Sequence, residues 1–130
     1  MDIMSKFHED FLMYFKYINY KGSDQNYVDN CKNYRRLFLR SLKNAEQHEL
    51  SNLLEEYQFA VHMDDGYEMY KRYFSLGGRN KKVLSLFREY LWFWGDYDFI
   101  IPELDKIIEE GKEQALDGIL DVVFKNSCKN

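Results

Sequence analysis

Three pairs of adjacent carboxylates come closest to an acid–base catalytic set in this chain: Glu55-Glu56, Asp64-Asp65 and Glu109-Glu110. Acid–base chemistry needs two carboxyl groups held in different environments on either side of a pocket. Neighbouring residues on a helix point about 100° apart and usually face water, so these pairs do not predict catalysis. The sequence also has no GxSxG elbow, no P-loop and no cysteine beside a histidine. We therefore expect a protein that is not an enzyme.

The three histidines are the other residues that could do chemistry, because each has an acidic residue nearby. His8 precedes Glu9 and Asp10, His48 precedes Glu49, and His62 lies two residues before Asp64. A zinc or di-iron site needs converging spacings such as HExxH or ExxH on facing helices. Neither pattern occurs. The sequence predicts no metal and no cofactor.

A glycine-rich segment, Gly77-Gly78-Arg79-Asn80-Lys81-Lys82, precedes an expected helix. Backbone N–H groups and positive charge at a helix N-terminus could hold a phosphate. The same residues also fit a glycine that ends one helix and an asparagine that caps the next, with lysines in water. Both interpretations stay open on the sequence alone.

The best candidate for a binding surface is the acidic and aromatic corner at Asp96-Tyr97-Asp98-Phe99, together with the acidic helices that follow it. Residues 96–121 contain nine acidic residues and only two basic ones, an excess of seven negative charges. Clustered carboxylates attract a cationic partner, and tyrosine is a common interface anchor. We expect the partner contacts to come from seven residues: Asp96, Tyr97, Asp98, Glu103, Glu109, Glu110 and Glu113.

A simpler explanation of the acidic residues is internal pairing. The segments Lys32–Lys43 and Lys71–Arg88 carry five and six positive charges without an acid, and Asn44–Tyr70 carries seven negative charges without a lysine or arginine. Helices of opposite charge could neutralise one another. If the acids of residues 96–121 were all paired in this way, the reason for choosing that surface would disappear.

Helical spacing of apolar residues recurs along the whole chain and indicates the elements that position this corner. We expect helices over residues 2–20, from Ser23 or Asp24 to about 43, 45–62 with an Asn44/Gln47 capping box, and 64–76. A central helix over 81–94 buries Val83, Leu84, Leu86, Phe87, Tyr90, Leu91 and Trp94, with Trp92 and Phe93 thickening the same face. Gly95 ends it. Helices over 102–110 and 112–124 follow, the last with Ala115, Leu116, Ile119, Leu120 and Val123 facing inward.

Composition agrees with an all-α protein. The chain of 130 residues is 45% hydrophobic, with one proline and seven glycines, which leaves few breaks and favours long helices. We expect a compact bundle of about six or seven helices, with a short stack of helical hairpins as the alternative. Residues 1–125 should form a single domain, and residues 126–130 a frayed tail.

Net charge and cysteine content argue against several classes of function and location. A net charge of −4 argues against binding to nucleic acid or to an anionic membrane. Two cysteines far apart in the sequence are typical of free thiols in a reducing compartment. The N-terminus lacks a signal-peptide pattern, and no run of 18 apolar residues could span a bilayer. We expect a cytoplasmic protein.

A small, acidic, aromatic-rich helical chain without catalytic motifs resembles the immunity proteins of bacterial toxin systems, such as contact-dependent growth inhibition. The segment LWFWGDYDFIIPELDKIIEEG is similar to the acidic and aromatic regions that such proteins offer to a toxin. The resemblance implies a tight complex with a cognate toxin domain, often a nuclease whose basic cleft the immunity protein occludes. Immunity proteins share no motif, so no residue role transfers by position.

Two other functions remain open. One is a viral or phage helical protein that blocks a host defence pathway, for instance a Bcl-2-like bundle with an apolar groove for a ligand helix. The other is a small-molecule or phosphate-binding enzyme, which an anion bound at Gly78–Lys82 would favour.

Overall fold

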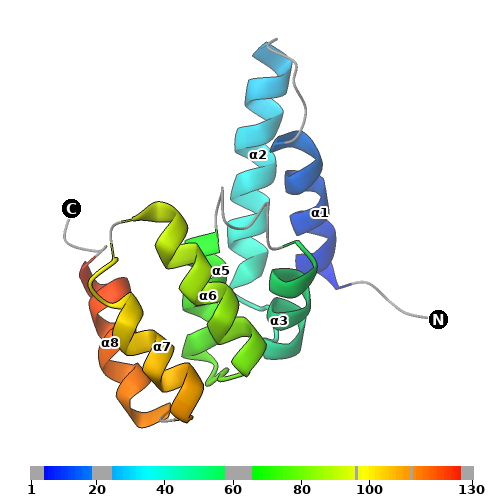
Figure 1. Ribbon diagram of the computed structural model, residues 1–130. Helices are drawn as coiled ribbons and strands as arrows, with labels where there is room; N and C mark the ends of the chain where they lie inside the picture. The colour runs from blue at the N-terminus through cyan, green and yellow to red at the C-terminus, as the bar shows by residue number, and fades with distance from the viewer. Residues whose placement is uncertain (1–4, 19–24, 58–65, 96, 112, 127–130) are drawn as a thin grey trace. The chain divides into compact units, whose positions relative to one another are not determined.

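The computed structural model of the chain describes residues 5–18, 25–57, 66–95, 97–111 and 113–126. These ranges contain seven helices and no strand: α1 Lys6–Ile18, α2 Gln25–Leu42, α3 Gln47–Glu56, α5 Gly66–Ser75, α6 Lys81–Trp94, α7 Ile101–Glu110 and α8 Glu113–Asn126 (Figure 1). The predicted all-α fold is confirmed, and the number of helices in the described ranges agrees with the six or seven predicted.

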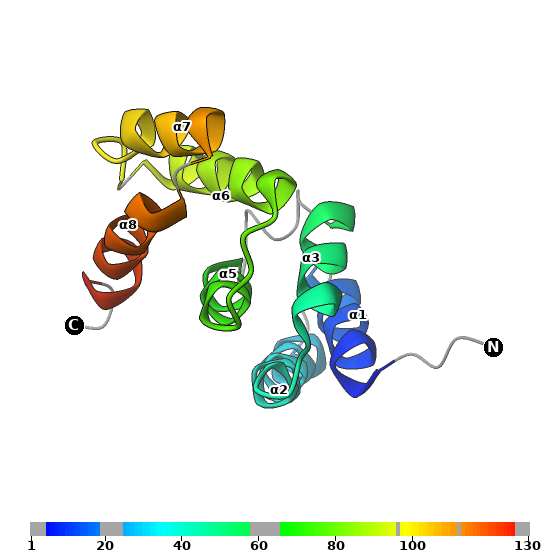
Figure 2. The ribbon, with the colours of Figure 1, turned by 90° about the horizontal axis from the view of Figure 1, so that it is seen from below.

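The chain divides into two compact units, Met1–Glu49 and Leu50–Asn130. In the first unit α1 and α2 lie side by side, and in the second α7 lies beside both α6 and α8 (Figures 1 and 2). The prediction of one domain over residues 1–125 stays a prediction. Of the expected tail, Asn126 is the last residue of α8, and residues 127–130 lie outside the described part.

Aromatic rings join the two helices of the first unit. Phe7, Phe11 and Tyr14 recur at helical steps along α1, and their rings lie 5.7, 5.9 and 5.5 Å from the ring of Phe38 in α2. Phe38 is only 1% exposed. Ring pairs at these distances add stabilisation to the buried apolar area, so this cluster accounts for the close packing of α1 on α2.

A second aromatic cluster lies in the second unit and is centred on α6. The ring of Phe87, which is fully buried, lies 5.2 Å from Tyr70 and 5.0 Å from Phe74 of α5, and 5.9 Å from Phe124 of α8. Helix α6 thus contacts rings from two helices and packs against α7 as well. This arrangement agrees with the predicted central role of the 81–94 helix.

Local signals set the helix ends mostly as predicted. The Asn80 side chain accepts a hydrogen bond from the Lys82 N–H and begins α6, while Gly95 ends that helix with φ of 77°. Gly111 ends α7 in the same left-handed conformation, with φ of 71°. Because a residue with a Cβ is strained there, glycine is the natural stop.

Two predicted starts were wrong. The capping contact of α3 lies two residues later than Asn44/Gln47: the Glu49 carboxylate accepts a hydrogen bond from the Glu46 N–H at 3.2 Å. Helix α1 begins at Lys6 and does not include Ser5, because the Ser5 hydroxyl accepts the His8 N–H at 3.1 Å and caps the helix. Residues 2–4, 19–24 and 58–65 of the predicted helices lie outside the described part.

The assignment of three α6 aromatics to the buried face was also wrong. Trp92, Phe93 and Trp94 are 61%, 48% and 47% exposed. At 100° per residue, Trp92 and Phe93 lie outside the arc of about 120° that holds Val83, Leu84, Phe87, Tyr90 and Leu91, whereas Trp94 lies within that arc but is the last residue of α6. Ala115 is likewise exposed instead of inward, because it lies 100° from the buried Leu116 on α8.

Candidate protein-binding surface

The predicted corner is a tight turn between α6 and α7. Backbone hydrogen bonds join the Ile100 N–H to the Tyr97 carbonyl at 2.9 Å and the Ile101 N–H to the Asp98 carbonyl at 3.3 Å. The half-buried Tyr97 donates its hydroxyl to the Val123 carbonyl of α8 at 3.3 Å. These contacts hold the turn in place, and they leave Asp98 exposed and Phe99 72% exposed. Asp96 lies outside the described residues.

The other predicted carboxylates lie on α7 and at the start of α8. Glu103 is in the first turn of α7, and Glu109 and Glu110 are in its last turn, with all three exposed. Glu103 and Glu110 are seven residues apart and therefore share one side of the helix, whereas Glu109 points about 100° away. The backbone of Glu113 begins α8, but its side chain lies outside the described part. The helix therefore spreads these charges over its outer face.

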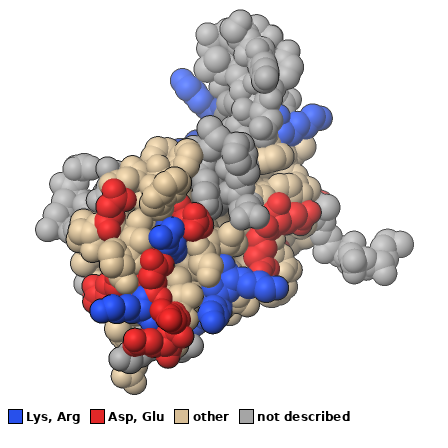
Figure 3. Space-filling view, in the orientation of Figure 1, with Lys and Arg blue, Asp and Glu red and all other residues tan. Residues whose placement is uncertain are grey.

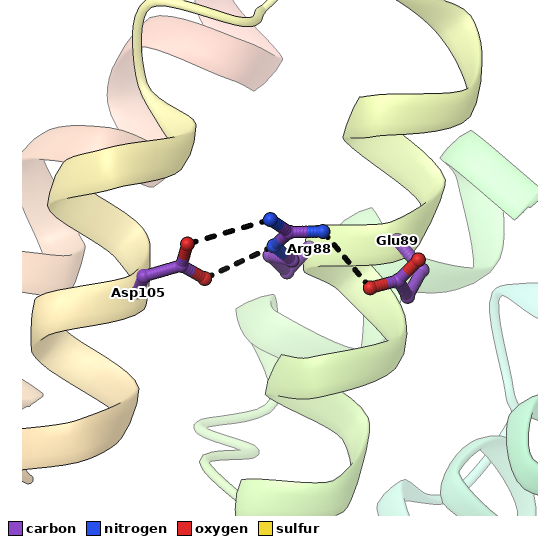
Figure 4. Close-up of polar contacts among 3 residues, drawn as sticks. All are labelled: Arg88, Glu89 and Asp105. Atoms are coloured by element: carbon purple, nitrogen blue, oxygen red, sulfur yellow. Dashed lines mark hydrogen bonds and ion pairs between the residues drawn. The ribbon is translucent and has the colours of Figure 1, made fainter.

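Some acids of residues 96–121 are neutralised internally, as the simpler explanation predicts. Arg88 of α6 donates to both carboxylate oxygens of Asp105 in α7, at 3.0 and 3.4 Å, and pairs with Glu89 at 3.0 Å (Figure 4). Arg79 pairs with Asp117 of α8 at 3.0 Å. Hydrogen bonding to Asp105, with a smaller effect from Glu89, raises the pKa of Arg88.

Other acids are not neutralised. Within the described ranges, Asp98, Glu103 and Glu109 form no ion pair, although all three are exposed. We call these three carboxylates the acidic surface. Internal pairing therefore explains Asp105 and Asp117 but not the acidic surface, and negative charge remains available to a partner there.

Sequence reasoning missed the aromatic part of this region. We call Trp92, Phe93, Trp94 and Phe99 the aromatic set; the ring of Trp94 contacts Phe93 at 5.5 Å, and the ring of Phe99 contacts Tyr97 at 6.4 Å. Figure 3 shows uncharged surface over the C-terminal end of α6, with acidic side chains near its border. The three consecutive aromatics were the signal that could have revealed this, since they cannot all face one side of a helix.

The segment Gly77–Lys82 has the geometry of a structural connection. The Asn80 N–H donates to the Tyr73 hydroxyl at 2.8 Å, and the Lys82 N–H donates to the Asn80 side chain at 2.8 Å. Gly78 is buried against the ring of Tyr73, where an added Cβ would lie 2.3 Å from that ring. Two of the amides that would cradle a phosphate are therefore already hydrogen-bonded.

A cavity of about 370 Å³ lies within the first unit, and its polar lining includes Lys6 and Arg40 as well as Asp10 and Glu49. The buried Asp10 accepts a hydrogen bond from Lys6 at 2.9 Å. A groove for the apolar face of a ligand helix is lined mainly by apolar side chains, whereas only two of the nine residues that line this cavity, Phe7 and Leu37, are apolar. No cluster of three metal-ligating side chains occurs in the described part of the chain.

Comparisons with family models, with curated proteins and with solved structures found no match to this chain. In the part of the chain that the structure describes, no helix combines the length and the apolar character that crossing a bilayer requires.

Proposed function

We propose that this chain is an immunity-type inhibitor: a protein without a reaction of its own that binds a cytotoxic enzyme in the cytoplasm and blocks its basic cleft. The observation that carries the proposal is the acidic surface. Asp98, Glu103 and Glu109 are exposed and, among the described residues, form no ion pair, although arginines of the same unit pair with Asp105 and Asp117. A cationic partner would neutralise these three carboxylates.

The distribution of charge along the chain supports the same proposal. Residues 1–49 contain eight basic and seven acidic residues, whereas residues 50–130 contain ten basic and fifteen acidic ones. The excess negative charge thus belongs to the second unit, which carries the acidic surface. Such an excess speeds association with a cationic surface and repels the nucleic acid that a nuclease toxin would otherwise bind.

The contact that we propose contains the seven residues predicted from the sequence, with Tyr97 in a partly different role. Its hydroxyl already bonds to α8, so Tyr97 holds the turn that presents Asp98 as well as offering part of its ring. Each exposed carboxylate would pair with a lysine or arginine around the cleft. Charge pairs of this kind, closed off from water, couple by about 1.5–7 kcal/mol each.

A charge-reversal experiment tests this proposal. The triple variant Asp98→Lys, Glu103→Lys, Glu109→Lys should weaken binding to a toxin domain encoded beside this chain by several kcal/mol, since three attractive pairs would become repulsive at about 1.5–7 kcal/mol each. Isothermal titration gives the affinity, and survival of cells that express the toxin domain gives the protection.

The control variant Glu9→Lys, Glu46→Lys, Glu56→Lys makes the same change in net charge at exposed acids elsewhere. It should retain affinity and protection. If both triple variants bind as the unchanged protein does, the contact lies on another surface. If the unchanged protein neither binds nor protects against that toxin domain, the proposed function is wrong.

A further inference from the structure

We propose that the aromatic set is the apolar anchor of the interface, and that the partner is a protein with an apolar socket bordered by lysine and arginine side chains. The inference deepens the proposed function and rests on it in taking the partner to be a cationic protein. It adds four residues that the sequence assigned to the core or left without a role.

Exposure is the first observation. Among the described residues, five large apolar side chains are exposed, and four of them are the aromatic set, within eight positions of the chain. The fifth is Met13, at 37%. Scattered exposed apolar residues are ordinary, whereas a group of tryptophans and phenylalanines is typical of the energetically dominant part of an interface.

The charges around the aromatic set indicate which kind of partner would bind there. Asp98 adjoins Phe99 and carries no ion pair within the described ranges, whereas Arg88, one helical turn before Trp92, is held by Asp105 and Glu89. The residues next to the aromatic set in the chain therefore offer the carboxylate of Asp98, and the cation one helical turn before Trp92 is already engaged. A partner with lysine or arginine around an apolar centre matches both features.

A tryptophan face also attracts cations directly. Trp92 is 61% exposed, so a lysine or arginine at the edge of the socket can lie over its ring. Such cation–π contacts are strongest for tryptophan among the aromatic residues. Other lysine or arginine side chains of the same partner would pair with the carboxylates of Asp98 and Glu103, which joins the aromatic and acidic contributions in one interface.

Two other occupants fit less well. In a symmetric dimer of this chain the same surface would face itself and bring its own carboxylates together, which is unfavourable. An anionic lipid surface would be repelled by the same carboxylates.

The chain contains two tryptophans, and both belong to the aromatic set. Its tryptophan fluorescence therefore reports on the C-terminal turn of α6, where both tryptophans lie. The probe is a synthetic amphipathic helical peptide made of leucine and lysine, added to the full chain. We expect a saturable blue shift of the emission and lower quenching by acrylamide, because the peptide would cover the rings.

Two matched peptides test the stated chemistry. Replacing every lysine by glutamate, or every leucine by serine, should weaken binding at least about tenfold, which corresponds to ~1.4 kcal/mol. No shift with the leucine–lysine peptide, or equal binding of the glutamate peptide, would overturn the inference.

Variants of the chain locate the contact. Trp92→Ala and Phe99→Ala should each weaken peptide binding about tenfold or more, while Met13→Ala, an exposed apolar residue of the other unit, should leave it unchanged. Trp94 remains as the reporter in the first variant. Asp98→Asn with Glu103→Gln should weaken binding as well, against Glu9→Gln as the control. An unchanged affinity of either aromatic variant or of the double carboxylate variant would refute the inference.

The remaining outcomes separate the alternatives. If sedimentation shows a dimer that Trp92→Ala abolishes, the aromatic set binds a second copy of this chain. If phosphatidylcholine vesicles cause a blue shift, the aromatic set binds lipid. Either result overturns the inference. If the chain binds the peptide through the aromatic set but protects no cell from the toxin domain, the inference holds and the proposed function fails. If the chain protects cells equally well with Trp92→Ala and Phe99→Ala, the proposed function holds and the inference fails.

Discussion

At the scale of single residues, two nearby tyrosines of α5 differ in whether their buried hydroxyl groups form hydrogen bonds. Tyr70 is fully buried, and its hydroxyl has no hydrogen-bond partner within the described part of the chain. The Tyr73 hydroxyl, also buried, accepts the Asn80 N–H at 2.8 Å. A buried polar group without a partner is destabilising, whereas a bonded one stabilises modestly.

The substitution Tyr70→Phe should therefore raise the free energy of unfolding, by about 1 kcal/mol, because it removes an unpartnered hydroxyl and keeps the ring. Tyr73→Phe should lower it by about 1–3 kcal/mol, because the Asn80 N–H loses its acceptor. Urea denaturation measures both values. Equal destabilisation by the two substitutions would mean that the Tyr70 hydroxyl does have a stabilising partner.

At the scale of the elements, packing and helix ends outweigh ion pairs. The Arg88 side chain is 29% exposed and that of Asp105 is 49% exposed, so the contact that joins α6 to α7 is worth at most about 1 kcal/mol. The adjacent Phe87 is fully buried among rings of α5 and α8, and truncating such a side chain to alanine typically costs about 3–5 kcal/mol. The position of α6 thus depends mainly on its apolar face.

Two glycines give a test at this scale. Gly118 lies inside α8 with open space where a Cβ would be, so Gly118→Ala should stabilise the protein by about 1 kcal/mol through helix propensity. Gly95 has equal space but a φ of 77°, so Gly95→Ala should destabilise it by about 1–2 kcal/mol through left-handed strain. Thermal unfolding distinguishes the two signs. If both substitutions lower the melting temperature, an unrecognised contact at Gly118 is responsible.

At the scale of the whole molecule, the buried tyrosines make stability sensitive to alkaline pH. Burial raises the pKa of Tyr70, with a smaller contribution from Tyr90, and burial also raises the pKa of Tyr73. In the unfolded chain both would ionise near pH 10. Above that pH the folded state binds more protons than the unfolded state, so stability falls as pH rises.

We expect the contribution of these tyrosines to stability to be constant through neutral pH and to fall above about pH 10, by about 1.4 kcal/mol per pH unit for each tyrosine kept neutral by folding. Tyr70→Phe should remove one such contribution and make the decline shallower. Urea unfolding at successive pH values measures the slope. An identical slope in the variant would show that Tyr70 ionises equally well in both states.

Helix formation was predictable because its determinants are close together in sequence. The apolar repeat Val83, Leu84, Phe87, Tyr90 and Leu91, the Asn80 cap and the Gly95 stop specify α6 almost to the residue. The capping of α3 was misjudged because two residue pairs have the spacing of a capping box, Asn44 with Gln47 and Glu46 with Glu49. Local patterns did not decide between these two pairs, and the folded structure uses Glu46 with Glu49.

The candidate site was only partly predictable because it depends on contacts between distant residues. The sequence by itself determined that carboxylates follow an aromatic helix, but not that Arg88 would neutralise Asp105 and leave Asp98 and Glu103 exposed. It also could not show that Trp92 faces water. Periodicity indicates which residues share one side of a helix, but it does not indicate how much of the helix surface the neighbouring helices cover. Packing partners decide burial, and they are chosen only when helices far apart in the chain come together.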